Sequence, residues 1–210
     1  PLIVSEVFLK PRINYGYTLL PYFLDKGSIL SNFLLYPFAN FDGIYYLLIA
    51  AKGYTVNAGF FPLFPLLINL STRLFGSNIL PFDPRQYLAA SFLVNSFFLA
   101  SLVLLFKLVR LDYKENVAIW SIIFLLIFPT SFFFATIYSE SLFLFLSLLT
   151  FYLARRKKWL ASGIVGVLLS ATRLVGIAIF PALLYEYFKS EKNKSLGKLL
   201  SILLIPLGLI

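Results

Sequence analysis

The chain has 210 residues, of which 60% are hydrophobic and 13% are charged, whereas a soluble domain averages about 45–50% apolar and about 25% charged residues. Uncharged runs extend over 86–106, 116–139 and 141–154, and a membrane-spanning helix needs roughly 17–25 apolar residues. These features exclude a soluble enzyme, a nucleic-acid-binding module and a disordered chain. They predict an all-α integral membrane protein.

Two residue types with reactive side chains are absent. The sequence contains no Cys and no His, which excludes a disulfide, a thiolate metal site, a cysteine nucleophile and a histidine base. Acid–base chemistry must then rely on the nine carboxylates, with Tyr and Lys as weaker candidates. The sequence also has no Met, begins at Pro1 and ends inside the apolar run 199–210. We therefore expect an internal segment that lacks at least one helix at each end.

The basic residues are unevenly distributed. The net charge is 18 − 9 = +9, and eleven of the 18 Lys and Arg residues fall within 107–114, 155–158 and 189–198. Membrane proteins concentrate Lys and Arg in short cytoplasmic loops, so we expect all three runs on the cytoplasmic side. The alternative is that the runs bind anionic lipids or an acidic partner.

Residues 1–60 differ from the rest of the chain. They contain several Pro and Gly residues and many aromatic residues, but no run long enough to span a membrane. We expect a large outer loop whose short amphipathic helices lie at the membrane interface, where aromatic side chains are common. Residues 61–210 are expected to form a transmembrane helical bundle, in which 61–80 either dips into the membrane and returns or crosses it once.

The basic runs predict the direction of the next three segments. The helix near 86–106 enters the cytoplasm at its end, 116–135 crosses outward, and 141–154 crosses back. Pro129 ends or kinks a helix, which suits an outer turn that extends to Tyr138.

The stretch 159–188 begins and ends at basic residues, so it must go out and return. Its 30 residues are too few for two full spans, which need about 40. We expect a short helical hairpin whose turn, at 172–176, lies in the membrane or at its outer edge. A broken helix at that depth must be buried in protein or line a wet cavity.

Seven of the nine carboxylates have a simple structural interpretation. Four lie among the basic residues of the cytoplasmic side and are expected to be solvated, since exposed mixtures of charges rarely have another role. One precedes a proline in a turn pattern, and two have basic neighbours. These seven are Glu6, Asp25, Asp83, Asp112, Glu115, Glu186 and Glu191.

Asp42 and Glu140 lie in apolar and aromatic surroundings. Ionisable groups in or beside membrane segments are costly to keep, and so they are candidates for function. Aromatic neighbours are expected to desolvate Asp42 and make it a better base. The structural alternative is that Asp42 caps a helix beginning near Gly43, and that Glu140 complements a helix dipole behind a Ser139 cap.

Arg173 is the third candidate, because it lies in the turn of the short hairpin with uncharged residues on both sides. Its structural role would be an ion pair with Glu140 or another carboxylate. Its functional role would be anion binding, since the guanidinium fork matches two phosphate oxygens. A carboxylate base with an anion site suits glycosyl transfer from a lipid-linked phosphosugar, although a transporter cavity would contain similar residues.

Three blocks of the sequence resemble one family. Residues 40–54 (NFDGIYYLLIAAKGY) with 60–66 (FFPLFPL), then Pro129 with 138–143 (YSESLF), then 171–176 (ATRLVG) are similar to blocks of the GPI mannosyltransferase 2 (PIG-V type) family. The resemblance covers about residues 38–185. It implies a GT-C type membrane glycosyltransferase that transfers a sugar, usually mannose, from a polyprenyl phosphate with inversion and needs no bound metal or other cofactor.

The resemblance also implies roles for individual residues. Asp42 matches the catalytic carboxylate of the first outer loop. For substrate binding we expect Phe41, Lys52, Tyr54, Tyr138, Glu140 and Arg173. Phe41 stands where Trp is more usual, and Leu174-Val175 replaces a Ser-Asn pair common in the eukaryotic enzymes. The acceptor therefore need not be a GPI precursor.

The expected partners are a polyprenyl-phosphate sugar donor resembling dolichyl-phosphate mannose, a lipid or glycan acceptor, and membrane lipids. The expected location is the plasma membrane of a prokaryote or the endoplasmic reticulum membrane of a eukaryote. Two alternatives remain: a polytopic transporter or lipid flippase without transferase activity, and a non-catalytic scaffold subunit. A transporter often contains inverted repeats, and the sequence has no evident repeat.

Overall fold

The computed structural model describes residues 36–54, 59–76, 83–191 and 195–209. Most of the predicted outer loop, with Glu6 and Asp25, lies outside these ranges. Within them the chain is helical and contains no strand. The α-helices are α4 (Asp42–Lys52), α5 (Leu63–Leu74), α6 (Pro84–Val109), α7 (Glu115–Ile127), α8 (Glu140–Arg155), α9 (Trp159–Ser170), α10 (Ile179–Ser190) and α11 (Leu196–Leu203). The short 3-10 helices are η1 (Tyr36–Ala39), η2 (Ser131–Phe134), η3 (Leu174–Ala178) and η4 (Ile205–Leu209).

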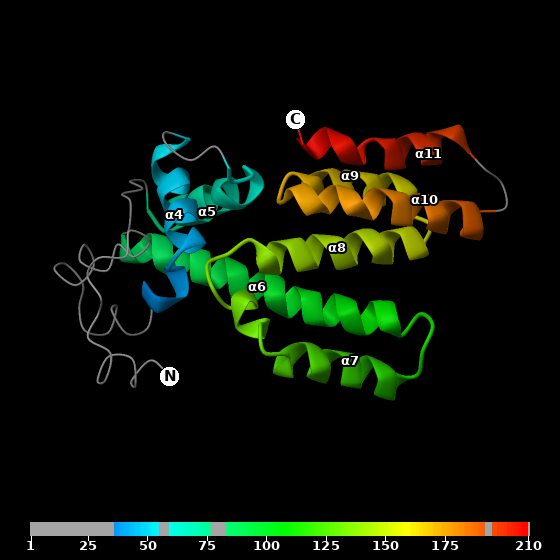
Figure 1. Cartoon of the computed structure of the whole chain (residues 1–210), viewed down its shortest axis with the longest axis horizontal. Helices are drawn as coiled ribbons and strands as arrows, with labels where there is room; N and C mark the ends of the chain where they lie inside the picture. Colours follow the sequence, from blue (N-terminus) through cyan, green and yellow to red (C-terminus); the bar gives the residue numbers. More distant parts are fainter. Residues whose placement is uncertain (1–35, 55–58, 77–82, 192–194, 210) are drawn as a thin grey trace.

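The bundle is built around α8. In Figure 1, α6 and α7 lie on one side of α8, while α9, α10 and α11 lie on the other. The small helices α4 and α5 gather at the end of α6 where that helix begins. The core runs through these contacts and includes the buried side chains of Phe64, Tyr87, Leu142, Trp159 and Leu183.

One helix within the described ranges, α6, is long and apolar enough to cross a membrane. Its 26 residues extend about 39 Å, more than the roughly 30 Å of a bilayer's hydrocarbon core. The helices α5, α7, α9 and the α11–η4 segment are apolar but shorter. With 12 residues, or about 18 Å, α5 is shorter than the hydrocarbon core of a bilayer.

Local sequence signals explain where the helices begin and end. The side chain of Asp83 caps α6 by accepting a 2.8 Å hydrogen bond from the backbone N–H of Arg85, and Pro84 occupies the first helical turn. The end of α7 has a similar local cause. Phe128 is extended because it precedes Pro129, so α7 ends after 13 residues. The stretch 116–135, which is expected to cross outward, is therefore not one continuous helix but α7 followed by η2, with the break at Pro129.

The described residues of the three basic runs lie at one end of the bundle. The guanidinium of Arg155 donates to both carboxylate oxygens of Asp112, at 2.7 and 2.6 Å, and lies 3.3 Å from Glu186. The hydrogen bonds from Arg155, together with its charge, hold the pKa of Asp112 below its usual range. Because these three residues come from three segments, their ion pairs join the α6–α7 loop to the end of α8 and to α10.

The prediction that Glu191 is solvated is wrong, because the residue is buried, with 8% of its surface exposed. Its carboxylate accepts hydrogen bonds from Lys198 Nζ at 2.9 Å and from Trp159 Nε1 at 2.7 Å. The hydrogen bond from Lys198 and, to a smaller extent, the one from Trp159 lower the pKa of Glu191. The sequence pattern missed this site because both partners lie on other helices.

Close packing of α9 against α11 depends on a glycine. A Cβ built on Gly163 would lie 2.0 Å from the carbonyl oxygen of Ser201, whereas one on Gly197 meets nothing closer than 3.9 Å. We expect Gly163→Ala to lower the free energy of unfolding by about 1–3 kcal/mol, because the backbone of Ser201 cannot move aside as a flexible side chain can. Thermal unfolding in detergent checks this, with Gly197→Ala as the control.

Gly197 lies in α11, the helix that Gly163 contacts. Gly197→Ala should leave the free energy of unfolding unchanged or raise it by roughly 0.5–1 kcal/mol. Equal destabilisation by the two substitutions would contradict the close packing of α9 and α11.

Candidate active site

The site begins where α4 begins. The helix begins at Asp42, one residue before Gly43, and no side chain caps its first turn. Asp42 therefore complements the helix dipole as the first helical residue, and it is not the predicted cap. Before it, Phe41 has φ 54° and ψ −120°, a conformation that non-glycine residues seldom adopt. Such strain is often found beside functional groups.

Asp42 is more accessible than predicted. Its side chain is exposed, and among the described residues no hydrogen bond or ion pair holds its carboxylate. The aromatic residues that follow it pack elsewhere: Tyr46 is buried, and the ring of Tyr45 stacks on Phe60 at 5.5 Å. The expected desolvation of Asp42 by its aromatic neighbours is therefore wrong, and the carboxylate is free to meet a substrate.

The turn before α8 packs against the start of α4, although about 95 residues separate them in sequence. The backbone N–H of Ile137 donates to the carbonyl of Phe38 at 2.7 Å, and the Tyr138 hydroxyl donates to the carbonyl of Asn40 at 3.0 Å. A Cβ on Gly43 would lie 3.1 Å from the carbonyl oxygen of Ile137. The glycine after Asp42 thus permits this close approach.

Tyr46 provides a second connection between these segments. Its buried hydroxyl donates to Ser139 Oγ at 3.1 Å. Ser139 makes no side-chain cap to α8, so the predicted serine cap is wrong, because the hydroxyl serves as an acceptor for Tyr46. Tyr46 itself had no predicted role. Its position four residues after Asp42, on the same helix face, was the available signal.

Glu140 and Arg173 form an ion pair between guanidinium Nη1 and carboxylate Oε1. Glu140 lies in the first turn of α8, and Arg173 lies in the extended link between α9 and η3. The side chains remain 29% and 41% exposed. The structural role considered for Arg173 is therefore present, and its exposed side leaves other N–H donors available to an anion.

The Phe-Phe-Pro segment joins the first and third blocks. The ring of Phe60 packs edge-on against Tyr46 at 4.9 Å. Three residues later, the backbone N–H of Leu63 donates to the carbonyl of Ala171 at 3.3 Å, just before Arg173. All three blocks of the sequence are thus brought together at one end of the bundle.

The charges of this cluster act on its tyrosines. Burial, with the negative charges of Asp42 and Glu140, raises the pKa of Tyr138 to about 12. Burial also raises the pKa of Tyr46, where Glu140 and Asp42 add to the effect while Ser139 and Arg173 oppose it. Both phenols therefore remain protonated near neutral pH and act as hydrogen-bond donors, which leaves the carboxylates as the candidate bases.

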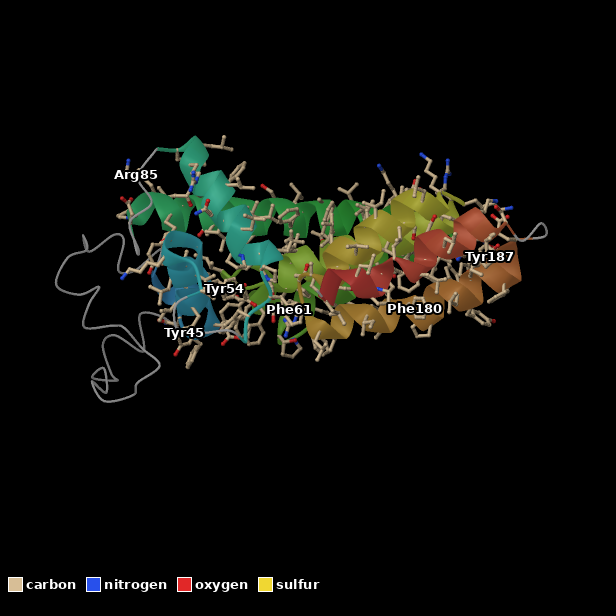
Figure 2. All side chains as sticks on the ribbon, turned by 90° about the horizontal axis from the view of Figure 1, so that it is seen from above. Tyr45, Tyr54, Phe61, Arg85, Phe180 and Tyr187 are labelled. Atoms are coloured by element: carbon tan, nitrogen blue, oxygen red, sulfur yellow. The ribbon has the colours of Figure 1, made fainter. Side chains whose placement is uncertain are left out.

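Of the predicted substrate-binding residues, Lys52 lies apart from this cluster, and Tyr54 reaches it only through Phe60. Lys52 and Tyr54 are exposed at the far end of α4, and ten residues of helix separate Lys52 from Asp42, or about 15 Å. The Tyr54 hydroxyl donates to the carbonyl of Phe60 at 2.7 Å. Figure 2 shows Tyr45, Tyr54 and Phe61 at the same end of the molecule, far from Tyr187. This hydrogen bond connects the chain just after α4 to Phe60.

A comparison with known protein families identifies the family of the chain. The model of a family described as mannosyltransferase (PIG-V) matches residues 15–191. No curated protein and no solved structure matches the chain. The family match covers most of the sequence and includes all three blocks that meet at Asp42, Glu140 and Arg173. The chain therefore belongs to the PIG-V mannosyltransferase family of membrane glycosyltransferases.

Proposed function

We propose that the protein transfers mannose from a polyprenyl-phosphate donor to an acceptor hydroxyl, with Asp42 as the general base. One observation carries the proposal. The carboxylate of Asp42 is exposed and makes no hydrogen bond or ion pair with the described residues, and it lies at the start of α4. The start of α4 packs directly against the segment bearing Glu140, which in turn pairs with Arg173. A base and an anion-binding group are thus available at one site.

The reaction follows from these two groups. The Asp42 carboxylate takes the proton of the acceptor hydroxyl as its oxygen attacks the anomeric carbon. A new carbon–oxygen bond forms there, the bond to the phosphate oxygen breaks, and the lipid phosphate leaves with that electron pair. Because attack and departure occur on opposite faces of the sugar, the anomeric configuration inverts.

Arg173 is proposed to hold the departing phosphate. It carries five N–H donors, and the ion pair with Glu140 engages Nη1. Glu140 would orient the guanidinium, while the remaining donors stabilise the charge that develops on the phosphate. Phe41, 57% exposed beside Asp42, would contact the sugar ring. Tyr138 would keep Asn40 and the start of α4 in place.

A cavity lined partly by the segment that follows Arg173 supports a lipid-linked donor. It has a volume of about 220 Å³ and lies between α8 and the η3–α10 segment, which begins directly after Arg173. Its walls are mostly apolar and include Phe143, Phe151, Val175 and Ile179. A phosphate at Arg173 would allow the first isoprene units of the donor to enter this cavity.

The surface of the bundle supports a membrane location for the site. The helices α6 and α7 expose large apolar side chains, among them Phe92, Leu99, Trp120, Phe124 and Ile127. Exposed apolar area of this kind suits contact with lipid. We propose that residues 61–210 form the membrane bundle and that residues 1–60, with Asp42, form the outer loop.

A transfer assay tests the proposal. Membranes containing the protein are supplied with polyprenyl-phosphate mannose labelled in the sugar, and the label is followed into other lipids and glycans. We expect the label to leave the donor in wild-type membranes and to stay on it in Asp42→Asn membranes. Unchanged donor that merely crosses the vesicle membrane in both would instead indicate a flippase, and would contradict the transferase mechanism.

A further inference from the structure

A second cavity lies at the opposite end of the bundle from Glu140 and Arg173. It has a volume of about 650 Å³ and opens between the start of α9 and the start of α11. Three lysines and two serines line it, together with Trp159: they are Lys157, Lys158, Lys198, Ser195 and Ser201. The full length of α8, about 24 Å, separates this cavity from Glu140.

The charge in the cavity is only partly neutralised. Glu191 binds Lys198 at 2.9 Å and is itself buried behind Trp159, whose Nε1 donates to its other oxygen. That pair cancels one positive charge. Lys157 and Lys158 make no ion pair with any described residue, so they give the cavity an excess positive charge.

Lys157 occupies a backbone position that suits another residue better. Its φ is 60°, in the left-handed region, directly after the C-cap of α8. Glycine is the usual residue at this position because it has no Cβ. A lysine here keeps its charge at the cavity at a conformational cost, which makes the position informative for a test.

The backbone adds donors to the same space. Trp159, Leu160 and Ala161 line the cavity and form the first turn of α9, where backbone N–H groups lack intrahelical acceptors. No side chain caps the start of α9 or of α11. These N–H groups supplement the two lysine charges.

The helices that form the cavity also expose apolar side chains. Leu160 is 63% exposed on α9, while Leu196 and Leu200 are 71% and 51% exposed on α11. A soluble phosphate would use the lysines alone, whereas a phospholipid would use both features. We propose that this cavity binds the phosphate headgroup of an anionic phospholipid, with its acyl chains against the leucines of α9 and α11.

The test uses the fluorescence of Trp159. The chain has two Trp residues, so Trp120→Phe leaves Trp159 as the only one. This variant in neutral detergent micelles is titrated with phosphatidylglycerol brominated in its acyl chains, and with equally brominated phosphatidylcholine. We expect saturable quenching by the anionic lipid and at least tenfold weaker quenching by the zwitterionic one.

Variants of the lysines locate the lipid. Each lysine near a lipid surface contributes about fivefold to affinity, so Lys157→Gln with Lys158→Gln should weaken binding at least tenfold. The matched control, Lys107→Gln with Lys114→Gln, removes the same charge from exposed positions at the same end of the bundle. It should change binding less than threefold, and equal weakening by the two pairs would overturn the site.

Two further measurements test Lys157 by itself and distinguish a lipid from a soluble anion. Lys157→Gly should bind the lipid about fivefold more weakly while its melting temperature stays the same or rises, because glycine suits the positive φ. Unchanged lipid binding in this stable variant would overturn the role of Lys157. Displacement of the brominated lipid by an equal concentration of inorganic phosphate would show a soluble-anion site and overturn the lipid assignment.

Discussion

Replacing Asp42 with Asn is expected to lower the rate of sugar transfer by about 10²–10⁴-fold, the usual contribution of a positioned general base. Asn has nearly the same shape as Asp, so the change removes the ability to accept a proton and little else. The carboxylate is exposed and has no hydrogen-bonding partner among the described residues, so folding should be preserved. The rate in purified enzyme, with thermal unfolding and donor binding alongside it, provides the measurement.

Asp42→Glu should recover little of the lost activity. The added methylene moves the carboxylate by about 1 Å, and a displacement of that size can cost about 10²-fold in rate. This variant separates the position of the base from its charge, because it retains the charge.

Glu115 offers a matched control for Asp42. It too is an exposed carboxylate in the first turn of a helix, but it belongs to α7 at the other end of the bundle. Glu115→Gln should leave transfer unchanged. If Asp42→Asn retained most of its activity while Glu140→Gln lost it, Glu140 would be the base, and the roles assigned to the two carboxylates would be reversed.

Arg173→Lys is expected to lower transfer by about 10²–10³-fold, the effect of removing one donor from a site that stabilises developing charge. Lysine retains the charge but loses the planar fork that meets two phosphate oxygens. The loss should be measured as weaker donor binding and slower transfer in a protein whose melting temperature is close to that of wild type.

The ion pair with Glu140 makes a control necessary, because a purely structural Arg173 would also be sensitive to substitution. Arg155→Lys changes an arginine that binds Asp112 and Glu186 at the opposite end of the bundle. It should leave donor binding unchanged even if it lowers stability. Normal donor binding by a well-folded Arg173→Ala protein would exclude the phosphate role.

Glu140→Gln distinguishes the orientation of the Arg173 guanidinium from its binding of the donor. It leaves the guanidinium of Arg173 without its carboxylate partner, so the side chain is held less firmly. We expect weaker donor binding than in wild type but a smaller loss than in Arg173→Lys, because every donor of the arginine remains. A larger loss than in Arg173→Lys would show that Glu140 contacts the substrate itself.

Local signals in the sequence were sufficient for several features of this protein. The uncharged run 86–106 predicts α6, while the cap by Asp83 and the proline in the first turn, which set the start of the helix, emerged from the structure. Pro129 predicts the end of α7, because the residue before a proline is disfavoured in the helical conformation. The absence of His and Cys reduces the candidate bases to carboxylates, and one of these, Asp42, lies in a block with a family resemblance.

The sequence could not determine which side chains meet. Arg173 had several carboxylates within its possible reach, and the fold selects Glu140, 33 residues away. Ser139 has the sequence context of a helix cap, yet Tyr46, on a distant helix, takes its oxygen as an acceptor. Such choices depend on how α4, α8 and the α9–η3 link approach one another, and periodicity within a segment carries no information about that approach.

Burial was likewise decided by tertiary structure. Asp42 has aromatic neighbours in sequence but is exposed, because Tyr46 turns into the core and Tyr45 stacks on Phe60. Glu191 has basic neighbours in sequence but is buried, because Trp159 and Lys198 reach it from two other helices. The residue types in a segment determine which chemistry is available, whereas exposure depends on the segments that cover it, and those come from elsewhere in the chain.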